Sequence, residues 1–354
     1  RADSWKWILV GVMAAAPVGA EVIFEENFDA QVDYIGEKHL NGGNSLWAES
    51  GDVVPEGWTA ISLWPKYSES YMEIVSSNKD KARGETGKSL VLRRGSFSGS
   101  WSGDSQLALN LPKDYDEVYV RFWIKFQPKW THDGYSKIFR IGSYPPNTRG
   151  SDYWSRIGMG FIWDYVHFSE SGLRNSLFAT PLGGGSFKNP PLGYTSNNFN
   201  GQGWNSNYTS FTYDLDGDGI KDNEPELLNR VDGGVIPDSG LIATHDHVFG
   251  DAWNELEFYV RINSRPGAQD GVLMQWLNGS LIFKNTSIPW VPYDAEMVGF
   301  NAVKFGGNDY FMAYPDSQQV QEWYAIDDIV IRSSLPDGEI KTAPPEPPNS
   351  ILVR

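Results

Sequence analysis

The most regular feature of the chain is an alternation of apolar and polar residues in short runs bounded by Gly, Asn, Asp and Pro. A period of two residues is typical of β-strands that bury one face. No window shows the spacing of a long amphipathic helix. The pattern predicts strands at Val22–Phe28, Ser89–Arg93, Gln106–Asn110, Glu117–Phe126, Ser136–Ile141, Ile157–Phe168, Glu255–Asn263, Val272–Leu277, Met297–Phe305 and Trp323–Arg332.

Many strands with turn-rich connections and no helical punctuation predict an all-β protein, a two-sheet antiparallel β-sandwich. The length of 354 residues fits one large sandwich domain. Aromatic residues make up 14% of the chain, with 15 Trp. Flat rings suit a pleated sheet and also stack on sugar rings, so a sugar ligand is compatible with this composition.

The two ends of the chain differ in composition from the body. Lys6 precedes an apolar run and then small residues up to Ala20, which predicts a signal peptide over 1–20 and a secreted, extracellular or periplasmic protein. The apolar run is too short to span a membrane. If the segment is retained as an apolar N-terminal arm, self-assembly is an alternative. The sandwich domain is predicted over 21–335, and 336–354 forms a Pro-rich tail or linker.

Charge narrows the classes of partner. The net charge of −16 argues against nucleic acid, which needs a basic face. Between Arg121 and Arg156, however, stand seven Lys or Arg and only two Asp. This stretch is the one place suited to an acidic ligand. The chain has no Cys, which excludes disulfides and Cys-based metal sites.

A long irregular insert is predicted from about 175 to 247, and an Asp-rich loop lies inside it. Carboxylates at alternate positions with Gly at the turn are typical of Ca2+ loops. We therefore expect a structural Ca2+ whose ligands are Asp214, Asp216, Asp218, Ile220 (through its carbonyl) and Asp222. A second metal site at His245 and His247 is an alternative without a visible third ligand.

Several motifs together resemble the concanavalin-like jelly-roll polysaccharide lyases, which include alginate, glucuronan and heparin lyases. They are DEVYVRFWIKF (116–126), SKIFRI (136–141), WNELEFYVRIN (253–263), WLNG (276–279), FGGN (305–308) and YAIDDIV (324–330). The resemblance implies a jelly-roll fold and an acidic polysaccharide as partner. The middle set also resembles laminin-G-like carbohydrate-binding domains, so the motifs indicate fold more than reaction.

A lyase needs a cation to neutralise the uronate carboxylate, a base for the neighbouring proton and an acid for the leaving oxygen. For these roles the chemistry of the side chains and their strand positions favour Arg140 and Arg156 as neutralisers, with His167 as base and Tyr165 as acid or second base. Lys137 is a further catalytic candidate, but in a regular strand it faces away from Arg140 unless a bulge intervenes. For sugar contacts we expect the aromatic and basic side chains Trp154, Trp163, Tyr259 and Arg261.

Two alternatives stay open. A glycosidase would use a carboxylate pair, and Glu255 and Glu257 share a predicted strand face with Tyr259 and Arg261, opposite an apolar face. The tighter Glu-Asp-Glu spacing expected of a jelly-roll glycosidase is absent, so a lyase is preferred. A non-catalytic carbohydrate-binding module, adhesin or assembly subunit would keep the same aromatic, calcium and export features.

Overall fold

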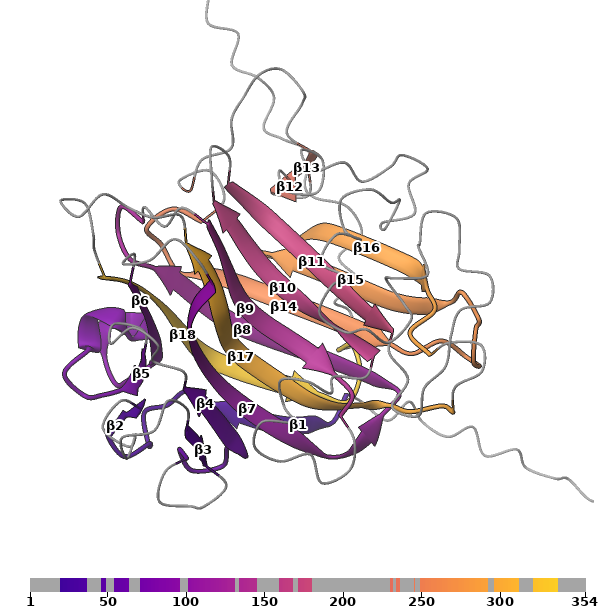
Figure 1. Cartoon of the computed structure of the whole chain (residues 1–354), viewed down its shortest axis with the longest axis horizontal. Helices are drawn as coiled ribbons and strands as arrows, with labels where there is room; N and C mark the ends of the chain where they lie inside the picture. The colour runs from indigo at the N-terminus through magenta and orange to yellow at the C-terminus, as the bar shows by residue number, and fades with distance from the viewer. Residues whose placement is uncertain are drawn as a thin grey trace, which may run out of the picture.

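A computed structural model describes residues 20–36, 46–48, 54–63, 71–95, 101–130, 134–144, 159–167, 171–179, 230–231, 234–235, 245, 249–291, 296–311 and 321–336. These residues form two antiparallel sheets stacked face to face (Figure 1). Two short 3-10 helices, η2 (Lys79–Lys81) and η3 (Arg83–Glu85), interrupt the strands. In the described parts of the chain, no helix is long and apolar enough to cross a bilayer.

The larger sheet, sheet A, has nine strands in the order β16-β15-β14-β8-β18-β6-β5-β2, with β1 also paired to β18. Their bounds are β1 (Val22–Glu26), β2 (Tyr34–Ile35), β5 (Tyr71–Ile74), β6 (Leu90–Gly95), β8 (Glu117–Phe126), β14 (Asn254–Arg261), β15 (Gly271–Leu277), β16 (Ser280–Ile288) and β18 (Gln321–Arg332). The last strand in sequence therefore lies in the middle of this sheet.

The smaller sheet, sheet B, has seven strands in the order β11-β10-β9-β17-β7-β4-β3. Their bounds are β3 (Leu46–Ala48), β4 (Ala60–Leu63), β7 (Trp101–Tyr115), β9 (Gly134–Gly142), β10 (Met159–His167), β11 (Ser171–Ala179) and β17 (Phe300–Phe311). A separate hairpin pairs β12 (Arg230–Val231) with β13 (Gly234–Val235).

The core between the sheets is built by the apolar members of each alternating strand. Phe122 and Phe258 of sheet A meet Phe139 of sheet B at ring-centroid distances of 5.1 and 4.5 Å. Phe305 of β17 joins the same cluster, 5.2 Å from Phe122. Such aromatic pairs add about 0.5–1.5 kcal/mol each beyond the burial of their area. These aromatic contacts therefore pack β9 and β17 of sheet B directly against sheet A.

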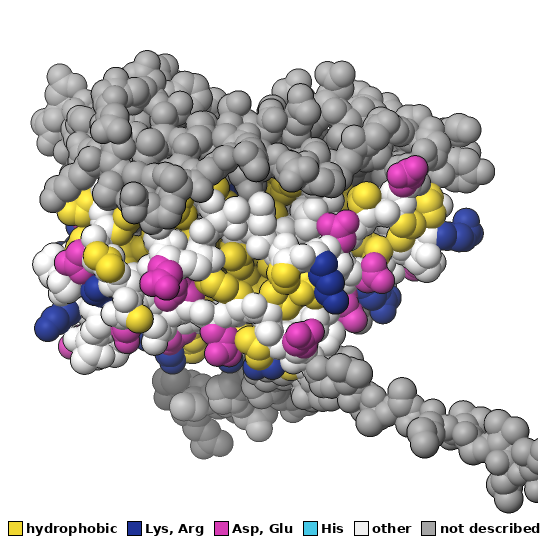
Figure 2. All heavy atoms as spheres, turned by 90° about the horizontal axis from the view of Figure 1, so that it is seen from below, with side chains coloured by type: hydrophobic (Ala, Val, Ile, Leu, Met, Phe, Trp, Pro, Cys, Tyr) yellow, Lys and Arg dark blue, Asp and Glu magenta, His cyan; other side chains and the backbone are white. Residues whose placement is uncertain are grey.

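The predicted sandwich and its jelly-roll class are confirmed, and each predicted strand overlaps an observed one. One boundary needs correction. The insert predicted from about Asn175 overlaps a strand, because Ser171–Ala179 forms β11 and pairs with β10 along its whole length. Figure 2 shows acidic and basic side chains interspersed over one face of the described molecule, so charge alone marks no site there.

Candidate functional site

A bulge in β9 decides which side chains share the outer face of sheet B, the face directed away from sheet A. Across the β9–β10 pair, Phe139 stands opposite Trp163, but the next paired residues are Lys137 and Asp164. Ile138 is therefore the extra residue of β9, and it packs in the core like Phe139. Two consecutive inward residues bring Lys137 and Arg140 to the same outer face, which the regular alternation forbids.

The neighbouring strands add charged groups to this face. Arg140 stands opposite Lys304 of β17 and Ile162 of β10, and Lys137 stands opposite Asp164. Directly paired residues of antiparallel strands project from the same face. We call Lys137, Arg140, Lys304 and Asp164 the cationic cluster, since it contains three cations and one carboxylate. Each of the four is at most 2% exposed.

Two glycines of β17 allow the cluster to form. The β9–β17 register is broken between Phe305 and Asp309, where Gly306 and Gly307 lie. Gly306 has a φ of 86°, a left-handed conformation that favours glycine. A Cβ on Gly307 would lie 2.6 Å from the Cβ of Lys137 and 3.1 Å from Nη2 of Arg140. The bare backbone of Gly307 is thus the surface on which Lys137 and Arg140 meet.

The surroundings of the cluster are polar at one end and aromatic at the other. Nζ of Lys304 lies 4.2 Å from the ring centroid of Tyr144, a cation–π distance. Gln106 of β7 is buried at the register position opposite Gly306. The arrangement can hold an anion by charge and by the guanidinium fork of Arg140, which matches a carboxylate in two hydrogen bonds.

Tyr165 and Trp163 do not belong to this cluster, which corrects their expected placement. Both side chains are fully buried on the core side of β10, the face opposite to Asp164. The Tyr165 hydroxyl lies 2.9 Å from Nδ1 of His245, whose Nε2 lies 3.2 Å from the carbonyl oxygen of Gly250. A carbonyl oxygen only accepts hydrogen bonds. In neutral His245, Nε2 therefore donates to Gly250, and Nδ1 accepts a hydrogen bond from the Tyr165 hydroxyl. Tyr165 is here a core residue, and Trp163 offers no surface for a sugar.

Tyr259 and Arg261 lie on the other sheet. The Tyr259 hydroxyl donates to Glu117 on the outer face of sheet A, where Tyr259 packs against Tyr119. Burial, followed by the Glu117 carboxylate, raises the pKa of the Tyr259 hydroxyl far above its ordinary value, so it stays protonated. The same face carries Glu255 and Glu257, the alternative glycosidase pair. Glu257 accepts a hydrogen bond from the Tyr119 hydroxyl at 2.6 Å.

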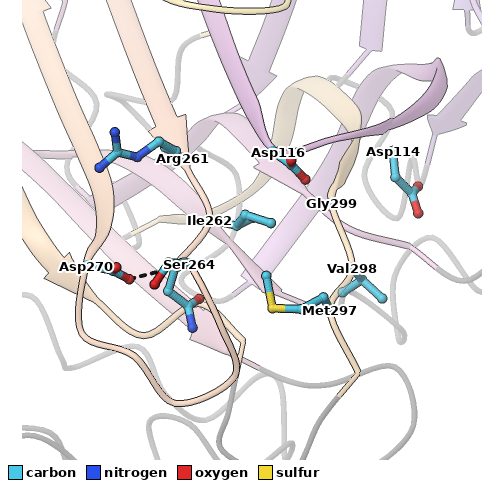
Figure 3. A pocket seen from close by; sticks show the side chains of 10 residues that line it. Asp114, Asp116, Arg261, Ile262, Ser264, Asp270, Met297, Val298 and Gly299 are labelled. Carbon is cyan, nitrogen blue, oxygen red and sulfur yellow. Dashed lines mark hydrogen bonds between the residues drawn. The ribbon is translucent and has the colours of Figure 1, made fainter.

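Arg261 lines a pocket of about 550 Å3 at the edge of the sandwich (Figure 3). Asp114, Asp116 and Asp270 line the same pocket. Hydrogen bonds from Ser264 hold the pKa of Asp270 below its usual value, so it is ionised at neutral pH. Three carboxylates around one Arg are unsuited to an anionic polysaccharide, and Arg261 does not share a site with Arg140.

Several predicted residues fall outside the part of the chain that the structure describes. These are Arg156, Trp154 and the calcium ligands Asp214, Asp216, Asp218, Ile220 and Asp222. His167 is the last residue of β10, opposite Gly134 of β9, and its side chain is likewise outside the description. Within the described residues no group of three or more His, Asp or Glu is placed to hold a metal. The calcium site stays a prediction.

Sequence reasoning missed Lys304, Asp164 and the role of Gly307. The signal for the bulge was present in the order Lys137-Ile138-Phe139-Arg140, where two adjacent apolar residues interrupt the alternation. Lys304 directly precedes the FGGN motif (305–308). Its position beside Arg140 could not be predicted, because only the sheet order places β17 next to β9.

No protein-family model and no curated protein matches the chain. Among solved structures, it is similar to the alginate lyase Aly36B in complex with alginate trisaccharide, with 14% identity, a TM-score of 0.45, and coverage of 89% of this chain and 98% of that one. A second is the endo-β-1,4-glucuronan lyase from the fungus Trichoderma reesei, with 11% identity, a TM-score of 0.38, and coverage of 85% and 94%.

A third is the cellulose-induced protein Cip1, with 14% identity, a TM-score of 0.40, and coverage of 86% of this chain and 97% of that one. The chain resembles jelly-roll polysaccharide lyases. Alginate and glucuronan lyases, which the sequence motifs resemble, are thus among the solved structures to which the chain is similar. At these identities the likeness concerns the fold alone.

Proposed function

We propose that the protein is a secreted polysaccharide lyase that cleaves a uronate-containing polysaccharide by β-elimination. The observation that carries the proposal is the cationic cluster, in which the β9 bulge brings Lys137 and Arg140 to one sheet face beside Lys304. In a protein of net charge −16, a concentration of cations on one face supports an anionic ligand. A uronate polymer supplies one carboxylate for every sugar ring.

The chemistry requires that a proton leave the carbon beside the carboxylate. Arg140 binds the carboxylate through its fork and stabilises the negative charge that develops when that proton is removed. Lys137, in its neutral form, takes the proton. The electron pair of the broken C–H bond forms a carbon–carbon double bond and the bond to the glycosidic oxygen breaks. The protonated Lys137 then gives its proton to this oxygen as it leaves, which restores the neutral amine. Arg156 and His167 remain proposed members of the same site.

Lys137 replaces Tyr165 as the favoured proton carrier because of the face on which each lies. The Tyr165 hydroxyl is directed into the core toward His245, whereas Lys137 shares the outer face with Arg140. Secretion, through the apolar segment 1–20, belongs to the proposal, since polysaccharides of this kind are extracellular.

The test is an assay of the full chain with a panel of uronate polysaccharides, run with Ca2+ and with a chelator. Absorbance from the new unsaturated bond is expected to rise on at least one polymer and to be lost in Lys137→Ala and Arg140→Ala. Lys79→Ala, an exposed change in η2, serves as control and is expected to retain the rate. A flat trace with retained polymer binding would assign a carbohydrate-binding module, and equal rates in all variants would place the chemistry elsewhere.

A further inference from the structure

A second arginine approaches the cationic cluster from the opposite side of sheet B. Arg94 ends the inward-facing series of β6, a strand of sheet A, and its side chain is fully buried between the sheets. Its Nη2 donates to the carbonyl oxygen of Gly307 at 3.0 Å and to the Tyr324 hydroxyl at 3.2 Å, and Nη1 donates to the Arg93 carbonyl at 2.9 Å. Arg94 therefore connects β6 and β18 of sheet A with β17 of sheet B.

A buried guanidinium is an expensive way to join two sheets. Removing a guanidinium from water has a cost that an apolar side chain joining the same sheets would not have. Arginine differs from an apolar residue in direction, because its planar fork fixes the positions of the oxygens that it binds. The location of those oxygens therefore indicates what Arg94 holds in place.

The oxygen of Gly307 belongs to the irregular stretch of β17. Between Phe305 and Asp309 the regular pairing with β9 is interrupted. The pairing with β7 continues in register through Asn308, so regular ladder hydrogen bonds are missing on the β9 side only. The hydrogen bond from Arg94 supplies a fixed point from the core side.

The other side of Gly307 is the contact surface of the two proposed catalytic residues. Its backbone approaches Lys137 and Arg140 so closely that an added Cβ would lie 2.6 Å from the Lys137 Cβ and 3.1 Å from the Arg140 Nη2. A displacement of Gly307 therefore moves the surface that lies against the Lys137 Cβ and the Arg140 guanidinium. Misplacements of about 1 Å in a catalytic group can lower a rate about 100-fold.

We propose that Arg94 is a positioning residue that acts through Gly307 to fix Lys137 and Arg140 relative to each other. It touches neither substrate nor reacting atoms. The catalytic consequence rests on the proposed lyase function, whereas the mechanical link from Arg94 through Gly307 to the cluster does not. The two parts can be tested separately.

The variants are Arg94→Met, which keeps most of the side-chain volume but loses the donors, and Arg94→Lys, which keeps the charge and can restore part of the contact. Tyr324→Phe removes the hydroxyl that is the second acceptor of Arg94 Nη2 and keeps the aromatic ring. Arg93→Met is the matched control, since Arg93 is adjacent on β6 but binds Glu73 on the outer face of sheet A.

The first measurement is independent of activity: backbone amide chemical shifts of Lys137, Arg140 and Gly307. Arg94→Met is expected to shift all three, and Arg93→Met to leave them in place. If Arg94→Met does not fold, Arg94→Lys and Tyr324→Phe provide the same comparison. Unchanged shifts at Lys137 and Arg140 in folded Arg94 variants would overturn the proposal, whether or not the protein is a lyase.

The second measurement is steady-state kinetics on a polymer that the wild type cleaves. Arg94→Met is expected to lower kcat about 10-fold to 100-fold with a change in KM of less than about 3-fold, and Arg94→Lys to recover part of the loss. Wild-type kcat in folded Arg94→Met would overturn the catalytic consequence, as would an equal loss in Arg93→Met. Absence of turnover by the wild type on every polymer would instead refute the proposed function, while the shift measurement still decides the link.

Discussion

The outer faces of the two sheets both carry buried charged residues but use them differently. On sheet A the contacts pair opposite charges, or donors with acceptors, across strands: Arg93 with Glu73, Tyr119 with Glu257, and Arg121 with Glu255. On sheet B the charged residues that are described and buried are the three cations and one carboxylate of the cationic cluster. The contacts on sheet A stabilise strand pairing, whereas three cations gathered around one carboxylate on sheet B give a positive local field that attracts an anionic ligand.

The largest expected effect separates the two faces by activity. Arg140→Ala is expected to lower kcat/KM about 100-fold to 1000-fold, because the carboxylate then lacks its neutralising partner. Arg121→Ala, on the outer face of sheet A with Glu255 3.7 Å away, is expected to remain within about 2-fold of wild type. Rates measured on the same polymer check this. Equal losses in both variants would remove the distinction between the faces.

The next effect concerns Asp327, on the outer face of sheet A. Burial raises its pKa to about 7 from 3.8, although the backbone N–H groups of Arg83 and Asp328 act in the opposite direction. Between these two values the folded state holds a proton that the unfolded state has lost. The free energy of unfolding should therefore fall as pH rises from about 4 to about 7, by at most about 4 kcal/mol, and then level off.

Denaturant titrations across this pH range measure that slope. Asp327→Asn is expected to flatten it, and Asp80→Asn, an exposed carboxylate of η2, to leave it unchanged. A slope that persists in Asp327→Asn would assign the pH dependence to another group.

Gly307→Ala tests the contact surface beneath the cluster. The added methyl group meets the Lys137 Cβ at 2.6 Å and the Lys137 carbonyl at 2.7 Å. We expect a loss of about 1–3 kcal/mol in unfolding free energy, as for other overpacked sites, together with lower turnover. In Gly84→Ala the methyl meets only Thr86 Oγ1, at 3.8 Å, so this variant should keep its turnover despite the positive φ. Thermal unfolding and kinetics on both variants separate the two effects.

The smallest effect is expected at Tyr259. Tyr259→Phe removes the hydroxyl that donates to Glu117 and should lower the unfolding free energy by about 1 kcal/mol. Turnover should not change, since the residue lies on sheet A. A selective rise in KM without loss of stability would return Tyr259 to the sugar-binding residues.

The fold was predictable from the sequence because alternation is a local property of each strand. β8 matches its predicted bounds, Glu117–Phe126, residue for residue. Short strands such as β2 and β3 carry too few residues to show a period. The C-terminal part of β11 was assigned to the insert, which was predicted to begin at about Asn175.

The site was less predictable because it depends on register and sheet order. Whether Lys137 and Arg140 lie on the same face of sheet B depends on one extra residue of β9, Ile138. The distinction between Trp163, which is in the core, and Asp164, which is outside, depends on the phase of β10. The meeting of Arg140 with Lys304 joins residues far apart in sequence, and only the pairing of β9 with β17 brings them together.

The central place of β18 has a consequence for how the protein folds during synthesis. β18 pairs with β8 on one side and β6 on the other, and β1 also pairs with it. Until Gln321–Arg332 has left the ribosome, sheet A therefore exists as two unjoined halves with exposed edges. Long-range pairing of this kind folds slowly and leaves such intermediates open to aggregation. A chain that stops before Gln321 should thus accumulate as aggregate instead of a smaller sandwich.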